Sequence, residues 1–118
     1  MIPAELGRLG EERAADYLQA NGYLVLDRNY RFMRGEIDIV ATDGDHIVFV
    51  EVKTRRSHSF GPPQDSVDEK KQKQLLKVAE AWLYERRMEK SRIRFDVIAV
   101  MNPGNKKEQL THIKDAFW

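Results

Sequence analysis

The segment from Glu36 to Thr54 constrains the fold of this chain more than any other, because it reads as two β-strands joined by a tight turn. Polar and apolar residues alternate at the start of 36–42, and residues 45–54 are rich in β-branched side chains, as is typical of strands. Asp43-Gly44 lies between the two runs and is a strong signal for a two-residue hairpin turn. The chain is therefore expected to form a β-hairpin near its centre.

The expected hairpin brings three ionisable groups to one face. A two-residue turn makes Asp38 face Phe49, and side chains alternate between the two faces of a strand. Asp38, Glu51 and Lys53 then share one face, with the Cβ atoms of the two carboxylate residues roughly 7 Å apart. The opposite face is apolar and is expected to be core: Ile37, Ile39, Val48, Val50 and Val52.

Two interpretations of this polar face are open. In the first, Lys53 neutralises Glu51 in a salt bridge on a solvated sheet. In the second, Asp38, Glu51 and the main-chain carbonyl of Val52 offer the hard oxygen ligands that suit Mg²⁺ or Mn²⁺. Such a metal lowers the pKa of water and neutralises phosphate charge, and Lys53 would orient water or stabilise the transition state of phosphodiester hydrolysis. The β-branched run favours the second interpretation, because it indicates a central strand covered on both sides.

The other segments predict a single α/β domain over residues 1–118, with a mixed β-sheet flanked by helices in the order α-β-β-β-α-β. The further elements are a helix over 3–20 that ends at Asn21-Gly22, a strand over 23–30, a helix from a capping box at Ser66 and Glu69 to about Glu89, a strand over 94–101, and a short edge strand within the tail 109–118. Arg94 and Asp96 are expected to form a structural ion pair.

Glu11 on the first helix is a further candidate for the site. On a helical wheel it lies at the edge of the apolar face, near Ala14 and Leu18, whereas Glu12 lies on the outer face. Glu11 is therefore able to point toward the sheet and join Asp38. The alternative is a boundary glutamate whose carboxylate reaches water.

Asp38, twelve intervening residues and then Glu51-Val52-Lys53 resemble the motif of the PD-(D/E)xK nuclease superfamily, which has the restriction-endonuclease-like fold. The chain is also similar to archaeal Holliday-junction resolvases, in which a first-helix glutamate, here Glu11, accompanies this motif. Ile37 departs from the wider pattern, which has proline before the aspartate. The resemblance implies a metal-dependent endonuclease acting on DNA, with branched or structured DNA and a symmetric homodimer expected by analogy.

The resemblance is closest to the YraN-type family of small bacterial proteins, and it covers nearly the whole chain. The matching segments are Gly10-Glu11, Gly22-Tyr23, Arg28-Asn29, Gly35-Glu36-Ile37-Asp38, Phe49-Val50-Glu51-Val52-Lys53-Thr54-Arg55, Phe60-Gly61 and Arg94-Phe95-Asp96. This match implies the restriction-endonuclease-like fold for the entire domain. A fold does not by itself determine an activity.

Basic residues near the expected site are candidates for phosphate contacts. Arg55 and Arg56 directly follow the strand that carries Lys53, and Lys70, Lys73 and Lys77 form one face of the second helix. Glutamates interrupt the helical face, so a purely solubilising role is an equal alternative there. The net charge of +1 gives no overall argument for nucleic acid.

Composition narrows the remaining classes. The absence of cysteine excludes disulfides and thiolate zinc sites and fits a reducing cytosol. No apolar run approaches about 18 residues, and no leader is apparent, so a cytoplasmic protein without a membrane span is expected. Two non-enzymatic alternatives remain open. One is a nuclease-fold module that binds nucleic acid in a repair or processing complex, and the other is an interaction scaffold.

Overall fold

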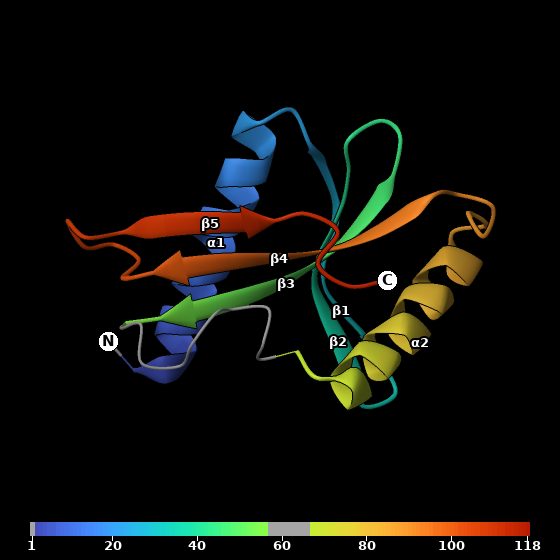
Figure 1. Cartoon of the computed structure of the whole chain (residues 1–118), viewed down its shortest axis with the longest axis horizontal. Coiled ribbons are helices and arrows are strands. Elements are labelled where there is room, and N and C mark those ends of the chain that lie inside the picture. The colour runs from blue at the N-terminus through green and yellow to red at the C-terminus, as the bar shows by residue number, and fades with distance from the viewer. Residues whose placement is uncertain (1, 57–66) are drawn as a thin grey trace.

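The computed structural model describes residues 2–56 and 67–118, and it has the predicted mixed α/β architecture of restriction-endonuclease-like type (Figure 1). Its sheet has five strands in the order β1-β2-β3-β4-β5, with β3 and β4 parallel and the other neighbours antiparallel. The elements are α1 (Pro3–Ala20), β1 (Leu24–Phe32), β2 (Gly35–Thr42), β3 (Ile47–Arg55), α2 (Glu69–Glu85), β4 (Ile93–Met101) and β5 (Gln109–Ile113). The predicted order is confirmed, and the tail adds the edge strand β5.

Each helix covers its own apolar core, one on either side of the sheet. On the α2 side, the ring of Phe49 packs 5.9 Å from that of Trp82 and 5.4 Å from that of Phe95. On the α1 side, Leu18 packs with a second group of buried residues that includes Val50. Burial of each such large side chain contributes about 1.5–3 kcal/mol. Strand β3 is therefore buried on both faces, as its β-branched run predicts.

The turn between β2 and β3 is longer than predicted. Thr42 pairs with Ile47, so four residues form the turn instead of two. The Asp43 carboxylate accepts hydrogen bonds from the backbone N–H groups of Asp45 at 2.9 Å and His46 at 2.7 Å, which stabilises this wider loop. The predicted pairing of Asp38 with Phe49 is wrong, because Phe49 pairs with Val40. The register shift is two residues, an even number, so Asp38 and Glu51 still share one face.

The predicted apolar face divides between the two cores. Ile39 packs in the core under α1, whereas Ile37 packs in the core under α2. At this level of the neighbouring strand β1, Asn29 has a positive φ of 52°. A left-handed residue interrupts the regular pleat of a strand, and Figure 1 shows the β1–β2 ribbon turning away from β3, β4 and β5. The single core face expected from strict alternation is therefore wrong at Ile37.

Helix α2 ends four residues before the predicted Glu89. Arg87 adopts a left-handed conformation with φ of 55°, and the Met88 N–H donates to the Leu83 carbonyl at 2.8 Å. This is the hydrogen bond of a Schellman motif, in which the left-handed position is usually glycine but is here Arg87. At the other end Asp68 is the N-cap and accepts from the Lys71 N–H at 2.8 Å, whereas Ser66 of the predicted capping box lies outside the described residues.

Helix α1 passes very close to the end of β3, because residue 10 is glycine. A Cβ atom added to Gly10 would overlap Thr54 Oγ1 and lie only 2.9 Å from Thr54 Cβ. Helix and strand therefore meet without an intervening side chain. This close packing brings the next residue, Glu11, beside the two strands that carry Asp38 and Glu51.

We expect Gly10→Ala to lower the free energy of unfolding by about 1–3 kcal/mol, because the added methyl group forces α1 away from β3. Gly7→Ala is the matched control, since no atom lies within 4 Å of its added Cβ and alanine favours the helix by about 1 kcal/mol. Urea denaturation of both variants measures the difference. An equal gain in stability for both would contradict the close contact.

Candidate active site

Asp38 lies where strand β2 stops pairing with β3. The last described pair of that ladder is Ile39 with Val50. Beyond it, the backbone N–H of Val52 donates to Asp38 Oδ2 at 2.8 Å. The side chain of Asp38 thus accepts a hydrogen bond from β3 beyond the last backbone pair. Continuing the register places Asp38 opposite Glu51, closer than the diagonal arrangement predicted from the sequence.

Glu51 is buried in mainly apolar surroundings. It is only 9% exposed and borders a small depression together with Ile37, Phe49 and Leu75. Its Oε2 atom is buried and has no hydrogen-bond partner within the described parts of the chain. The closest cationic group, Lys71 Nζ on α2, is 4.0 Å from that oxygen. An isolated buried carboxylate oxygen is costly, so this atom is suited to receive a cation.

The surroundings of Asp38 disfavour the ionisation of its carboxyl group. Burial, followed by the negative charge of Glu51 and a hydrogen bond with it, raises the pKa of Asp38 to about 8, against the lowering effect of the Val52 N–H. Without a bound cation, Asp38 therefore retains a proton near neutral pH. Perturbed carboxyl pairs of this kind are characteristic of functional sites.

Glu11 reaches the same region from α1, as the helical wheel predicts. Burial and then the charge of Asp38 raise its pKa. With the Asn29 amide in the orientation that satisfies its hydrogen bonds, the amide nitrogen donates to Glu11 and Glu36, each at 3.0 Å. Asn29 and Glu36 were missed from the sequence. Glu36 stands two residues before Asp38, which was a usable signal, whereas the left-handed Asn29 gave none.

Lys53 does not neutralise Glu51. It is half-buried on β3, two residues beyond Glu51, and it forms no ion pair or hydrogen bond with any other described residue. The cation near Glu51 is instead Lys71, which the sequence did not single out among the neighbouring lysines of α2. The interpretation of Glu51 and Lys53 as a simple surface salt bridge is therefore wrong.

The oxygen atoms at this site fit a hard divalent cation. Asp38 and Glu51 supply carboxylates, and the carbonyl of Val52 points to the same side of β3 as its N–H, which bonds Asp38. In residues 2–56 and 67–118, no group of three or more histidine, cysteine, aspartate or glutamate residues is arranged to hold a metal. A metal here would thus have two carboxylates and one carbonyl, and Mg²⁺ typically keeps several waters beside so few protein ligands.

The residues predicted to contact phosphates lie in two places. Arg55 is the last residue of β3 and Arg56 follows it, and Arg55 Nη1 donates to the Thr54 carbonyl at 2.8 Å. Lys70, Lys73 and Lys77 line a groove between α2 and the turn that joins β1 to β2. The matching segment Phe60-Gly61 of the resemblance lies outside the described residues.

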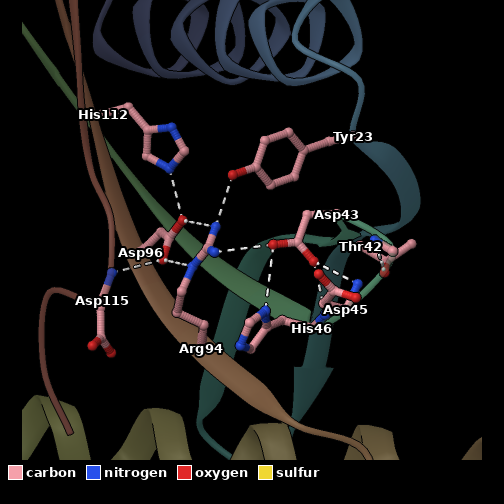
Figure 2. Close-up of polar contacts among 10 residues, drawn as sticks. Tyr23, Thr42, Asp43, Asp45, His46, Arg94, Asp96, His112 and Asp115 are labelled. Carbon is pink, nitrogen blue, oxygen red and sulfur yellow. Dashed lines mark hydrogen bonds and ion pairs between the residues drawn. The ribbon is translucent and has the colours of Figure 1, made fainter.

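A second polar cluster lies at the start of β4, and Figure 2 shows it centred on Arg94. Asp96 is fully buried and accepts hydrogen bonds from Arg94 Nε at 2.8 Å and from the Asp115 N–H at 3.0 Å, with His112 Nε2 2.7 Å away. Arg94 also donates to Asp43 in the β2–β3 turn at 3.1 Å. The predicted ion pair is confirmed, and it ties β4 to the tail and to the hairpin turn.

Comparison with known proteins finds one family. Residues 10–100 match the family described as "Uncharacterised protein family UPF0102". The UPF0102 protein of Geotalea daltonii is 46% identical over 95% of this chain and 88% of its own length. Those of Prosthecochloris aestuarii and Caldicellulosiruptor saccharolyticus are 44% and 46% identical, over 97% and 100% of their own lengths. No helix in the described part of the chain is long and apolar enough to cross a membrane.

Half-buried Asp38 and fully buried Asp96 should respond in opposite ways to the same substitution. In chelator at pH 8, Asp38→Asn should keep the melting temperature or raise it by up to about 4 °C, or about 1 kcal/mol, because it removes like-charge repulsion. Asp96→Asn should lower stability by about 3 kcal/mol, because it leaves Arg94 without its buried counter-ion. Thermal melts measure both. A large fall in the melting temperature of Asp38→Asn would contradict the repulsion between the Asp38 and Glu51 carboxylates.

The pH dependence provides a second check on Asp38. Its pKa is about 8 in the folded chain, against about 3.9 for an aspartate in an unfolded chain. Between these values the folded state holds a proton that the unfolded state has released, so this group's contribution to stability falls as pH rises. We therefore expect Asp38→Asn to flatten the decline of the melting temperature between pH 5 and 8.

Proposed function

The chain belongs to the UPF0102 family, and we propose that it is a divalent-metal-dependent nuclease of the PD-(D/E)xK type that hydrolyses phosphodiester bonds in DNA. The observation that carries this proposal is the close pair of half-buried Asp38 and buried Glu51, with one Glu51 oxygen lacking a hydrogen-bond partner among the described residues. This arrangement is unfavourable in the protein alone. A cation between the carboxylates would remove the repulsion.

Each residue of the site has a role in this proposal. Asp38, Glu51 and the Val52 carbonyl hold Mg²⁺ or Mn²⁺, which when bound activates water and neutralises phosphate charge. Lys53, two residues beyond Glu51 on β3, presents its ammonium group to the phosphoryl oxygens and stabilises their developing negative charge. Glu11, held by Asn29, orients water from the α1 side.

The basic residues supply the contacts to the DNA backbone. Arg55 and Arg56 follow Lys53 along the chain at the end of β3. The α2 lysine Lys70 is next in sequence to Lys71, which lies 4.0 Å from Glu51. Contacts of this kind position the substrate without selecting a sequence. From the resemblance to resolvases we extend the proposal to branched or structured DNA and to action as a homodimer in the cytoplasm.

A second candidate is a non-catalytic module that binds nucleic acid in a repair or processing complex. It is favoured by the absence, within the described residues, of a cluster of three or more acidic or histidine ligands for a metal. This candidate shares the basic surface with the first. The two differ only in whether the carboxylates support hydrolysis.

Cleavage and metal binding should separate the roles of Asp38 and Lys53. With Mg²⁺ at ten times its Kd, we expect the wild-type melting temperature to rise by about 6 °C, equivalent to about 1.4 kcal/mol. Asp38→Asn should lose both this rise and cleavage of a panel of linear, nicked, flapped and four-way DNA. Lys53→Ala should lose cleavage but keep the rise, because Lys53 is not a ligand.

The matched control is Lys90→Ala, which removes a lysine from the distant connection between α2 and β4 and should change neither readout. Full cleavage by Lys53→Ala would remove that residue from the mechanism. Binding of DNA without cleavage of any substrate, in Mg²⁺ or in Mn²⁺, would favour the non-catalytic module.

Replacing Lys70, Lys73 and Lys77 together by alanine should weaken DNA binding at low salt and make it less salt-dependent. Each lost phosphate contact lowers the slope of log affinity against log salt by about 0.9 on duplex DNA. The control replaces Lys106 and Lys107, two exposed lysines in the turn between β4 and β5. Fluorescence anisotropy over a salt series measures the slopes, and equal slopes for the two variants would exclude the α2 lysines from the interface.

A further inference from the structure

A groove with an unusual combination of side chains runs between α2 and the turn that joins β1 to β2. Its volume is about 390 Å³. Four of its nine lining residues are positively charged, and none carries a carboxylate: Arg34, Lys70, Lys73 and Lys77 are joined by Phe32, Met33, Gly35, Gln74 and Val78. We call this surface the basic groove. Its charge makes it attractive to phosphate groups.

Apolar side chains stand exposed among these cations. Phe32 is 38% exposed and Met33 is 86% exposed, although both are large and apolar. Phe32 is the last residue of β1 and pairs with Gly35, which lies so close to α2 that an added Cβ atom would overlap the side chain of Val78. The backbone of Phe32 is thus part of the sheet beside α2 and does not belong to a loose surface loop.

The adjoining cavity farther along α2 has the opposite character. It has a volume of about 610 Å³ and shares Phe32 and Lys77 with the basic groove, but its other lining residues include Glu80, Glu85 and the exposed Tyr84. Two carboxylates against one lysine disfavour a phosphate there. The groove suited to nucleic acid therefore ends near Lys77.

The other end of the basic groove lies beside the candidate active site. Lys70 marks this end, whereas Gly35, which lines the groove against Val78, begins the strand β2 that carries Asp38. Lys71, which follows the groove residue Lys70 on α2, approaches Glu51 to 4.0 Å. A strand of nucleic acid lying in the groove would thus lead to the carboxylates.

We propose that the basic groove binds a single-stranded segment of the DNA, with its phosphates on the lysines and an unpaired base stacked on Phe32. Sites for single strands combine a positive groove with exposed aromatic rings, whereas a duplex presents only base edges and phosphates to a protein. This inference rests on the proposed nuclease function and specifies its substrate class as DNA with an unpaired arm, such as a flap, overhang or splayed branch.

Binding is measured by fluorescence anisotropy in chelator, so that the test does not depend on cleavage. The probes are a labelled oligothymidine and a blunt-ended duplex of the same length. Phe32→Leu should weaken binding of the single strand about fivefold or more and leave duplex binding unchanged, because only stacking is lost. Tyr84→Leu is the matched control, an exposed aromatic of the neighbouring acidic cavity whose loss should change neither affinity.

Photo-crosslinking of wild-type protein to an oligonucleotide containing 5-iododeoxyuridine keeps the test independent of how Phe32→Leu folds. Crosslinks at Phe32 or Met33 support the proposal, and crosslinks confined to other residues overturn it. Equal effects of Phe32→Leu on single-stranded and duplex DNA also overturn it. A dimer that Phe32→Leu converts to monomer in sedimentation would identify the groove as a protein interface instead. Normal single-strand binding without any cleavage would refute the nuclease proposal alone.

Discussion

The pairing of β2 with β3 ends at Ile39 and Val50, and the arrangement of the candidate site depends on that end point. Beyond it, β3 continues beside β4 through Arg55, while the β1–β2 ribbon twists away (Figure 1). The Val52 N–H bonds the side chain of Asp38 where the ladder has ended. This exchange of a backbone partner for a carboxylate draws Asp38 toward Glu51, in a region that the cores under both helices shield from water. If the β2–β3 pairing continued for two more residues, the Val52 N–H would bond the backbone of β2, and the Asp38 side chain would not accept from it.

Asp96 and Asp38 show that burial alone does not identify a functional carboxylate. Asp96 is fully buried, but hydrogen bonds from Arg94, His112 and the Asp115 backbone lower its pKa against the effect of burial. Burial and then the charge of Glu51 raise the pKa of Asp38, which receives only one opposing backbone hydrogen bond. The first arrangement stabilises the charged form and fastens β4 to its surroundings. The second arrangement disfavours the charged form of Asp38 in the protein alone. This repulsion between the two carboxylates is what points to a bound cation.

The polar face of the hairpin was predictable, whereas its register was not. Side-chain alternation has a period of two, so a shift of two residues preserved the shared face of Asp38 and Glu51. The shift itself came from the Asp43 side chain, which caps a four-residue turn that the Asp-Gly pair does not announce. Sequence patterns likewise did not predict the left-handed conformation of Asn29, whose amide donates a hydrogen bond to Glu11. They also did not predict which lysine of α2 lies near Glu51. These features depend on tertiary contacts, and periodicity reports only which face a residue occupies.

A net charge of +1 conceals a pronounced separation of charge on this small domain. Glu11, Asp38 and Glu51 gather where β2 leaves β3, while Arg34 and three lysines line the groove beside them without a carboxylate. Charges exposed to solvent interact over about 8–10 Å at physiological salt, so such neighbouring regions act on a ligand separately. A polyanion is attracted to the groove, whereas its approach to the carboxylates is opposed until a cation lies between them. In the proposed function, this separation of charge would couple DNA binding in the basic groove to metal binding at the carboxylates.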